Sequence, residues 1–294
     1  MSSRSIYRSS KGEVRVLEMY DRFQADVGVQ LEDHTVNTRF GTTHVLATGP
    51  ENAQPVVITH GGNQTNPHAL RNLSPLLKLN QYRVYAPDTI GHPGKSAQTR
   101  LSPRDSSYGR WLDDVLDGLN LESAAFVGGS FGAGIILRLA AYAPQRISKL
   151  ALFVPSGIVR VPLSSMVFRI GGPYLRYLLS PSRERLIQAV QWMGDDLNEE
   201  DLEWIEVAFR HVRIEPEMPR PATKKELEGL EAPTLVIAAE QDTMFPGDAV
   251  VKRAKEIIPN LVAAECLEGG THFSSGEDIE YINGRIHEFL QVGR

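Results

Sequence analysis

The chain has 294 residues, of which 41% are hydrophobic, so it is long enough to bury a large core. Its formal net charge is −5 and it contains no block of lysine or arginine, which argues against a nucleic-acid partner. The single cysteine, Cys266, excludes an internal disulfide, and its strand-like neighbours predict a packed thiol rather than a nucleophile.

Residues 1–11 contain serine and arginine but lack the apolar centre of a secretory signal, so they are interpreted as a loose arm. No run of about 18 apolar residues occurs anywhere in the sequence, so no membrane-spanning helix is predicted. We therefore expect a cytoplasmic protein with no membrane partner, and the composition leaves a homodimer open.

The first predicted elements are strands that begin an antiparallel part of a sheet. The spacing of Val14 and Val16 suggests a strand over residues 13–20. Two further strands are predicted at 35–38 and 43–47.

Short, continuously apolar runs then predict parallel strands that are covered on both faces. Helical patterns separate these runs, so strand and helix alternate along the chain. The strands are predicted at 55–59, 82–86, 124–129, 149–154, 233–239 and 261–267, and the helices at 67–79, 108–119, 135–141 and 277–291.

The alternation stops between residues 156 and 230, where only helical patterns occur. We predict one α/β domain, made of residues 1–155 and 231–294, with a helical cap inserted at 156–230. The cap begins with an arginine-rich part and continues with an acidic part at 195–206. We interpret these charges as solvated, or as paired with each other within the cap, rather than as a site for an anionic substrate.

The run Gly128-Gly129-Ser130-Phe131-Gly132 lies between a predicted strand and a predicted helix. A serine in such a tight turn needs glycine two positions before and after it, because side chains there would collide as the backbone reverses. This pattern is typical of a nucleophile elbow and indicates Ser130 as the nucleophile.

A serine hydroxyl needs a base to take its proton and a carboxylate to hold that base in one tautomer. Of the eight histidines, His272 follows the last predicted strand in a glycine-preceded loop, and it is the preferred base. Asp242 follows the strand at 233–239 and is the preferred acid, with Glu240 as the runner-up. His60 also ends a strand, but we interpret it as a brace for its loop.

A phosphate-binding loop is suggested only superficially by Gly94-Lys95-Ser96. The P-loop pattern requires a further glycine five residues earlier, where this chain has Thr89. We interpret residues 91–96 as a surface loop. No cluster with metal-ligand spacing is present, so neither a metal nor a cofactor is expected.

The order Ser130, Asp242, His272 resembles that of the α/β-hydrolases, as does the loop His60-Gly61-Gly62. The similarity extends from about residue 55 to residue 290 and is strongest to bacterial carboxylesterase-like members. It implies an α/β fold with an eight-stranded, mostly parallel sheet, helices on both faces, and a cap between the sixth and seventh strands. It also implies ester hydrolysis.

The resemblance further implies an oxyanion hole made by the backbone N–H groups of Gly62 and Phe131, with Asn63 as second choice for Gly62. An insertion after the sixth strand emerges at the edge of the sheet where ligands bind in open α/β folds. We therefore expect Trp192 and Trp204 of the cap, together with Asn63, to line the substrate pocket.

These residues favour a serine hydrolase that cleaves a small or medium carboxylic ester through an acyl-enzyme on Ser130. Hydrolysis of a C–C bond in a diketone, or perhydrolysis, would use the same three residues. A non-catalytic receptor for a small ligand is the alternative from a different class. An aspartate at position 130 would suggest haloalkane or epoxide chemistry, and the serine argues against both.

Overall fold

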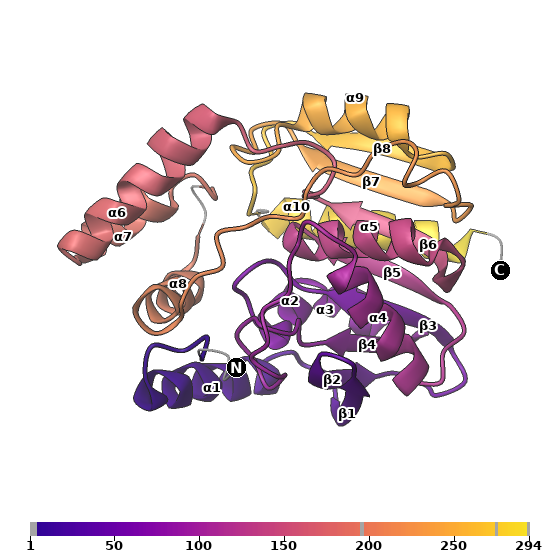
Figure 1. Cartoon of the computed structure of the whole chain (residues 1–294), viewed down its shortest axis with the longest axis horizontal. Helices are drawn as coiled ribbons and strands as arrows, with labels where there is room; N and C mark the ends of the chain where they lie inside the picture. Colours follow the sequence, from indigo (N-terminus) through magenta and orange to yellow (C-terminus); the bar gives the residue numbers. More distant parts are fainter. Residues whose placement is uncertain (1–4, 195–196, 274–275, 293–294) are drawn as a thin grey trace.

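The computed structural model describes residues 5–194, 197–273 and 276–292, and its centre is one eight-stranded sheet (Figure 1). The strand order is β1-β2-β4-β3-β5-β6-β7-β8. The strands are β1 (Glu32–Thr38), β2 (Gly41–Thr48), β3 (Gln54–Thr59), β4 (Tyr82–Pro87), β5 (Ala124–Gly129), β6 (Ile147–Phe153), β7 (Thr234–Ala239) and β8 (Leu261–Leu267). β2 is antiparallel to β1 and β4, and every later pair is parallel, which confirms the predicted fold class.

Helices cover both faces of this sheet because its central strands are apolar throughout; β5 and β7 are buried at every position. The apolar cluster on one face includes side chains of α4 (Ser107–Gly118), α5 (Phe131–Tyr142) and α9 (Gly247–Ile257). The cluster on the other face includes side chains of α2 (Asn66–Asn72), α3 (Ser74–Lys78) and α10 (Gly276–Gln291). Within the described ranges, every helix is too short or too polar to cross a bilayer.

The predicted strand at 13–20 is wrong, because this segment belongs to helix α1 (Ser10–Ala25). Its buried side chains are spaced as one helical face: Val16, Met19, Tyr20 and Phe23. Ser9 Oγ caps the helix by accepting a hydrogen bond from the N–H of Gly12 at 3.0 Å. The alternation that suggested a strand included Val14, whose side chain is exposed.

Between β6 and β7 the chain forms a π-helical turn, η2 (Ser165–Gly171), followed by α6 (Gly172–Leu179), α7 (Arg183–Val190) and α8 (Glu199–His211). We call these four elements the inserted helices. Figure 1 shows α6 and α7 together at one end of the molecule, away from the sheet.

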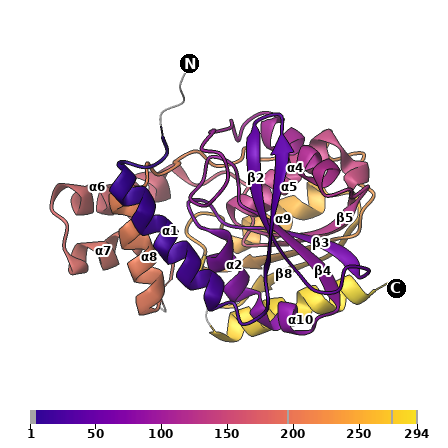
Figure 2. The same ribbon diagram turned by 90° about the horizontal axis from the view of Figure 1, so that it is seen from below.

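The N-terminal segment packs on the inserted helices, and Figure 2 shows α1 running beside α8 and α2. The N–H of Arg8 donates to the carbonyl of His211, and the N–H of Arg213 donates to the carbonyl of Ile6, both at 2.8 Å. Ile6 and Tyr7 are buried in an apolar cluster with α1 and α8. The sequence predicts a loose arm at residues 1–11, but the segment is packed from residue 6 onward; residues 1–4 lie outside the described residues.

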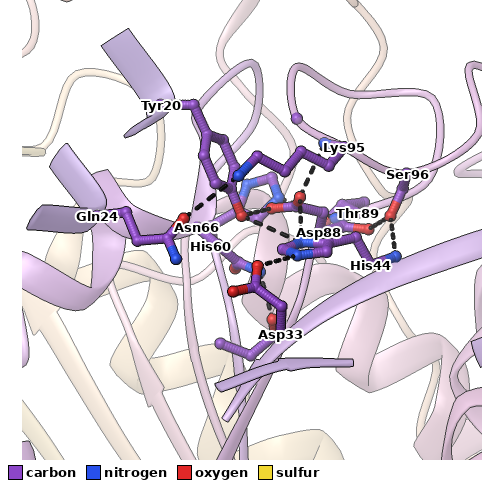
Figure 3. A network of polar contacts seen from close by, with 12 residues as sticks. Tyr20, Gln24, Asp33, His44, His60, Asn66, Asp88, Thr89, Lys95 and Ser96 are labelled. Carbon is purple, nitrogen blue, oxygen red and sulfur yellow. Dashed lines mark hydrogen bonds and ion pairs between the residues drawn. The ribbon is translucent and has the colours of Figure 1, made fainter. Parts of the chain in front are cut away.

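A buried polar network joins α1 to the loop after β4 (Figure 3). His44 lies between two carboxylates, with Nδ1 3.1 Å from Asp88 and Nε2 2.7 Å from Asp33. The hydroxyl of Tyr20 on α1 donates to Asp88 at 3.2 Å. Burial lowers the pKa of His44, but the two carboxylates outweigh burial, and the pKa is raised from its ordinary value.

Cys266 lies on β8, at the edge of the sheet, and it is exposed rather than packed. Its prediction as a packed thiol is wrong because an edge strand has a neighbour on one side only. Burial of part of the side chain, with the carboxylates of Asp248 and Glu240, raises the pKa of the thiol. A raised pKa keeps the thiol protonated, which does not suit a nucleophile.

Candidate active site

Ser130 connects the end of β5 to the start of α5 with φ 49° and ψ −120°, a backbone conformation that non-glycine residues rarely adopt. A Cβ on Gly132 would lie 2.4 Å from the carbonyl oxygen of Thr59, and one on Gly128 would lie 2.9 Å from the backbone nitrogen of Ala133. Both positions therefore require glycine. The turn holds Ser130 at the carboxyl end of the sheet.

Ser130, His272 and Asp242 form a continuous chain of hydrogen bonds. Ser130 Oγ is 3.0 Å from His272 Nε2, and His272 Nδ1 is 2.8 Å from Asp242 Oδ2. Asp242 lies in the loop after β7 and His272 in the loop after β8, so the three side chains come from the carboxyl ends of three parallel strands of one sheet. Glu240, the runner-up acid, is exposed and instead accepts a hydrogen bond from the N–H of Gly269 at 2.8 Å.

The loop after β7 keeps Asp242 ionised. Its second oxygen, Oδ1, accepts hydrogen bonds from the N–H groups of Met244 at 2.7 Å and Phe245 at 3.0 Å. Burial raises the pKa of Asp242, but His272 and these two N–H donors outweigh burial, and the pKa is lowered. An ionised Asp242 requires the proton on His272 Nδ1, which leaves Nε2 as an acceptor toward Ser130.

Two backbone N–H groups beside Ser130 have no acceptor among the described residues: those of Gly62 and Phe131. The two residues lie against each other, since a Cβ on Gly62 would be 3.3 Å from Cβ of Phe131. The N–H of Asn63, the second choice in the sequence, donates to His92 Nδ1 at 3.0 Å. The free donors are therefore those of Gly62 and Phe131.

His92 and the side chain of Asn63 hold this loop in place, and sequence reasoning missed both contacts. The His92 ring is buried, with its centroid 4.6 Å from that of Phe131. Burial holds the pKa of His92 well below its ordinary value, which keeps the imidazole neutral and able to accept a hydrogen bond. The Asn63 amide exchanges two hydrogen bonds with the backbone of Glu215, at 3.0 and 2.7 Å.

His60 braces the neighbouring turn, as its place in the sequence indicates. Its Nε2 accepts from the N–H of Thr89 at 2.9 Å, and its Nδ1 donates to the carbonyl of Gly61 at 2.8 Å. Burial lowers its pKa, so the ring is neutral in this role.

A cavity of about 360 Å³ opens over Ser130 and His272. Asn63, Trp192 and Trp204, the three pocket residues predicted from the sequence, are part of its lining. The rest is mainly apolar, including Leu73, Met166, Ile170, Tyr174, Ala189, Met193, Ile205, Phe209, Ile214, Met218, Met244 and Ile282. Glu215 is the one acidic residue among the described lining residues, and no lysine or arginine is among them.

The indole of Trp192 lies directly beside the imidazole of His272, with ring centroids 5.6 Å apart. Trp204 approaches the cavity from α8 and packs on the other side against Phe23 of α1. Within the described ranges, no group of three or more His, Cys, Asp or Glu side chains has an arrangement that suits a metal ion.

Comparison with known proteins agrees with the observed fold. The sequence model of the family described as alpha/beta hydrolase fold matches residues 54–170. The crystal structure of carboxylesterase CesB (YbfK) from Bacillus subtilis superposes with a TM-score of 0.81 at 26% identity, covering 97% of this chain and 100% of that one. The chain has the α/β-hydrolase fold.

Proteins similar to this chain are named for different reactions. Naproxen esterase from Bacillus subtilis superposes with a TM-score of 0.82 at 24% identity, covering 97% of this chain and 100% of that one. A 2-hydroxy-6-oxononadienedioate/2-hydroxy-6-oxononatrienedioate hydrolase from Pseudomonas putida is 26% identical over 82% of this chain and 89% of its own length. Two of these three relatives are named as carboxylesterases or esterases.

Proposed function

We propose that this α/β-hydrolase is a carboxylesterase that hydrolyses small or medium lipophilic esters through an acyl-enzyme on Ser130. The observation that carries the proposal is the hydrogen-bonded chain Ser130–His272–Asp242 at the base of a mainly apolar cavity. The names of the two Bacillus subtilis relatives support ester hydrolysis. In this proposal residues 1–155 and 231–294 form the catalytic core, and residues 156–230 form a cap over it.

Acylation uses the three residues in sequence. Ser130 Oγ attacks the ester carbonyl carbon while His272 Nε2 takes the hydroxyl proton, and Asp242 stabilises the imidazolium that forms. The carbonyl oxygen gains negative charge and accepts hydrogen bonds from the N–H groups of Gly62 and Phe131. The C–O bond to the alcohol then breaks, and His272 gives its proton to the departing oxygen.

Deacylation repeats these steps with water. A water molecule attacks the acyl carbon as His272 takes one of its protons, and the same two N–H groups bind the oxyanion. Ser130 Oγ then leaves, recovers the proton from His272, and the carboxylic acid is released.

The cavity lining favours esters over the other substrates considered. The P. putida relative is named for a hydrolase of dioates, which carry two carboxylates. No lysine or arginine occurs among the described lining residues, so a doubly anionic substrate would lose its hydration without gaining a cationic partner. Three similar proteins are named haloalkane dehalogenases, but an alkyl-enzyme ester needs a carboxylate nucleophile, and position 130 is a serine.

Ser130→Ala tests the proposal. The variant should lower kcat on p-nitrophenyl esters by at least about a thousandfold, because the attacking oxygen is removed while little buried surface is lost. Ser164→Ala, which changes an exposed serine outside the cavity, should leave kcat unchanged. A fluorophosphonate should label the wild-type protein on Ser130, located by mass spectrometry. A wild-type protein that is neither labelled nor active on any ester in the panel would instead support the ligand receptor.

A further inference from the structure

The outer side of η2, α6 and α7 exposes large apolar side chains to solvent. Phe168 is 77% exposed, Leu175 is 56% exposed and Leu179 is 78% exposed. Four more large apolar side chains of the same segment are exposed: Leu163, Val167, Leu178 and Ile187. We call these seven side chains the apolar patch. They make up about half of the exposed large apolar side chains in the described part of the chain, although they fall within 25 residues.

Part of this patch follows a single line along one helix. Leu175 and Leu179 are four residues apart in α6, a spacing that places them on one face of that helix, and the exposed Phe168 lies on η2, which leads directly into α6. Arg169 and Arg176 each follow a patch residue by one position, so they form a second line beside the first. The helix therefore presents an apolar line flanked by a cationic line to solvent.

The charge of this segment is opposite to that of the whole chain. Residues 160–185 contain five arginines and one acidic residue, whereas the complete chain carries −5. Among the described residues, Arg183 is the one of these five arginines that forms an ion pair, and its partner is Glu199. Arg160, Arg169 and Arg176 pair with no acidic side chain in the described part of the chain.

The sequence interpretation was that these arginines are solvated or paired with the acidic part at 195–206, but most described acidic side chains of that part bind other residues. Glu200 of α8 binds Arg71, Glu203 binds Arg15 and Arg22 of α1, and Glu206 binds Arg210. Asp195 and Asp196 lie outside the described residues, and Asp201 binds His68. Apart from the pair with Arg183, pairing among the described residues of the inserted helices therefore leaves Arg160, Arg169 and Arg176 without an acidic partner.

The opposite side of the same helix borders the cavity. Met166, Ile170 and Tyr174 line the cavity above Ser130, while Phe168 and Leu175 point to solvent. One helix thus separates an external apolar surface from the site where an ester would be cleaved. A lipophilic molecule at the external surface would lie within the width of a helix, about 10 Å, from the cavity.

We propose that the apolar patch and its arginines dock on an anionic lipid surface, from which lipophilic ester substrates enter the cavity. An interfacial helix has an apolar face that inserts among acyl chains and a cationic flank that meets anionic headgroups. Entry of ester substrates from the lipid surface rests on the proposed carboxylesterase activity, whereas docking on the lipid surface is independent of that activity. The absence of a long apolar run in the sequence argues only against a helix that crosses the membrane. A helix that lies at the membrane surface does not need such a run.

Charge favours the lipid surface over a second copy of this chain. In a two-fold interface the same patch is present on both sides, so the unpaired arginines of one copy would approach those of the other. A single-stranded nucleic acid could also pair with the arginines, but its bases bind by stacking on exposed aromatic rings. The patch is aliphatic except for Phe168. Anionic headgroups and acyl chains match both parts of this surface.

Vesicle sedimentation with the Ser130→Ala protein tests the docking separately from catalysis. We expect this protein to sediment with phosphatidylglycerol vesicles and to stay in solution with phosphatidylcholine vesicles. The double variants Phe168→Ser/Leu179→Ser and Arg169→Gln/Arg176→Gln should each bind phosphatidylglycerol vesicles at least about tenfold more weakly. The control for the apolar variant is Val262→Ser, which removes an exposed apolar side chain from β8. The control for the arginine variant is Lys252→Gln/Lys255→Gln, which removes two positive charges from α9. Both controls should bind vesicles like the parent protein.

Three results would overturn the proposal. They are no sedimentation with phosphatidylglycerol vesicles, equal binding to phosphatidylcholine vesicles, and equal loss of binding in the control variants. Loss of a dimer in sedimentation velocity for Phe168→Ser/Leu179→Ser, without any vesicle binding by the parent, would assign the patch to a second copy of the chain. With Ser130 restored, the patch variants should keep the parent kcat on a water-soluble short ester, because none of the changed residues lines the cavity.

Discussion

Asp242 is buried, ionised and placed to determine which nitrogen of His272 carries a proton. An amide at position 242 could donate to His272 Nδ1, which would place the ring proton on Nε2, facing Ser130. The imidazole could then no longer accept the serine proton. The charge of this one carboxylate is therefore central to the proposed reaction.

Asp242→Asn should lower kcat on esters by about a thousandfold or more, with a smaller change in KM. The control is Glu240→Gln, because Glu240 also follows β7 but bonds to Gly269 rather than to the imidazole. Steady-state kinetics of both variants on one p-nitrophenyl ester make the comparison. A larger loss for Glu240→Gln than for Asp242→Asn would contradict the assignment.

His92 acts one step farther from the reacting atoms, as a positioning residue. Its Nδ1 accepts the N–H of Asn63, the residue next to the proposed oxyanion donor Gly62. If His92 Nδ1 were removed, the N–H of Asn63 would lose its hydrogen bond, and the loop would hold the N–H of Gly62 less firmly in its direction. The sequence offered a weak signal for this role, because a histidine and a proline interrupt the glycine-rich loop after β4.

His92→Leu should lower kcat by about tenfold to a hundredfold while KM changes little, because the loop would bind the oxyanion less well than the ground-state ester. His92→Asn should restore part of kcat, since an Asn side-chain oxygen can accept at nearly the position of Nδ1. The two variants are compared by kcat and KM on the same ester. Equal loss of kcat in both variants, accompanied by equal loss of thermal stability, would show that His92 acts only in packing.

At the scale of elements, the parallel strands were predictable because each is a short apolar run ended by glycine, proline or a polar residue. β3, β5 and β7 differ from the predicted ranges by a residue or less. Helix α1 was not predictable in the same way, because the alternation of Val14 and Val16 suggests a strand, whereas the helical face becomes evident only when Tyr20 and Phe23 are included.

In the site, too, features set by neighbouring residues could be predicted from the sequence, whereas contacts between residues far apart in the sequence could not. The elbow and the order of Ser130, Asp242 and His272 depend on local patterns at strand ends, so the sequence predicts them. The contacts of Asn63 with His92 and with Glu215 join residues 29 and 152 positions apart, and no local pattern encodes them. Sequence analysis could place Asn63 near the pocket but could not assign it a positioning role.

The attachment of α1 through Tyr20, Asp88 and His44 should make stability depend on pH. The pKa of His44 is raised in the folded protein. Its contribution to the free energy of unfolding is therefore fully present below the pKa of the unfolded state, about 6.5, and is lost as pH rises through the pKa of the folded state. His44→Gln should therefore lower the free energy of unfolding by about 1–3 kcal/mol at pH 5.5–6 and by less at higher pH.

Urea unfolding of the wild-type protein and His44→Gln at several pH values measures this difference. His34→Gln is the control, because the His34 side chain is 40% exposed and its ionic partner is the exposed Glu32 rather than a buried carboxylate. Its effect on the free energy of unfolding should be small. If the difference in unfolding free energy between the wild-type protein and His44→Gln grew as pH rises, His44 would have to be neutral in the folded protein.

At the scale of the whole molecule, three apolar clusters hold the chain together, and the third is the one that local patterns did not predict. It joins Ile6, Tyr7 and the buried face of α1 to α7 and α8. The pairing of Ile6 with Arg213 spans more than 200 residues, so it forms only when the complete fold is assembled. The inserted helices are consequently fixed to the N-terminal segment on one side, while the apolar patch of η2 and α6 remains exposed on the other.

Trp192 and Trp204 line the same cavity but belong to different parts of this arrangement, so their removal should have different effects. Trp204 is 2% exposed and packs against Phe23 of α1 and His68 of α2. Trp204→Ala should lower the free energy of unfolding by about 3–5 kcal/mol, because it leaves a cavity where three helices meet. Trp192 is only partly buried and lies beside His272, so Trp192→Ala should cost less stability and enlarge the space next to the reacting carbonyl.

The ratio of kcat/KM for long and short p-nitrophenyl esters, measured with the unfolding free energy of each variant, separates the two roles. Trp192→Ala should shift this ratio toward longer or bulkier acyl groups by about tenfold, since a few added contacts in a pocket are worth ~1–3 kcal/mol of discrimination. Fluorophosphonate labelling of Ser130 should continue in this variant, because the tryptophan makes no hydrogen bond to the three reacting residues. If Trp192→Ala instead lost stability as Trp204→Ala does and left the ratio unchanged, both tryptophans would be packing residues. Acyl selectivity would then have to arise from the rest of the lining, where Met166, Ile170 and Tyr174 of η2 and α6 face the same space.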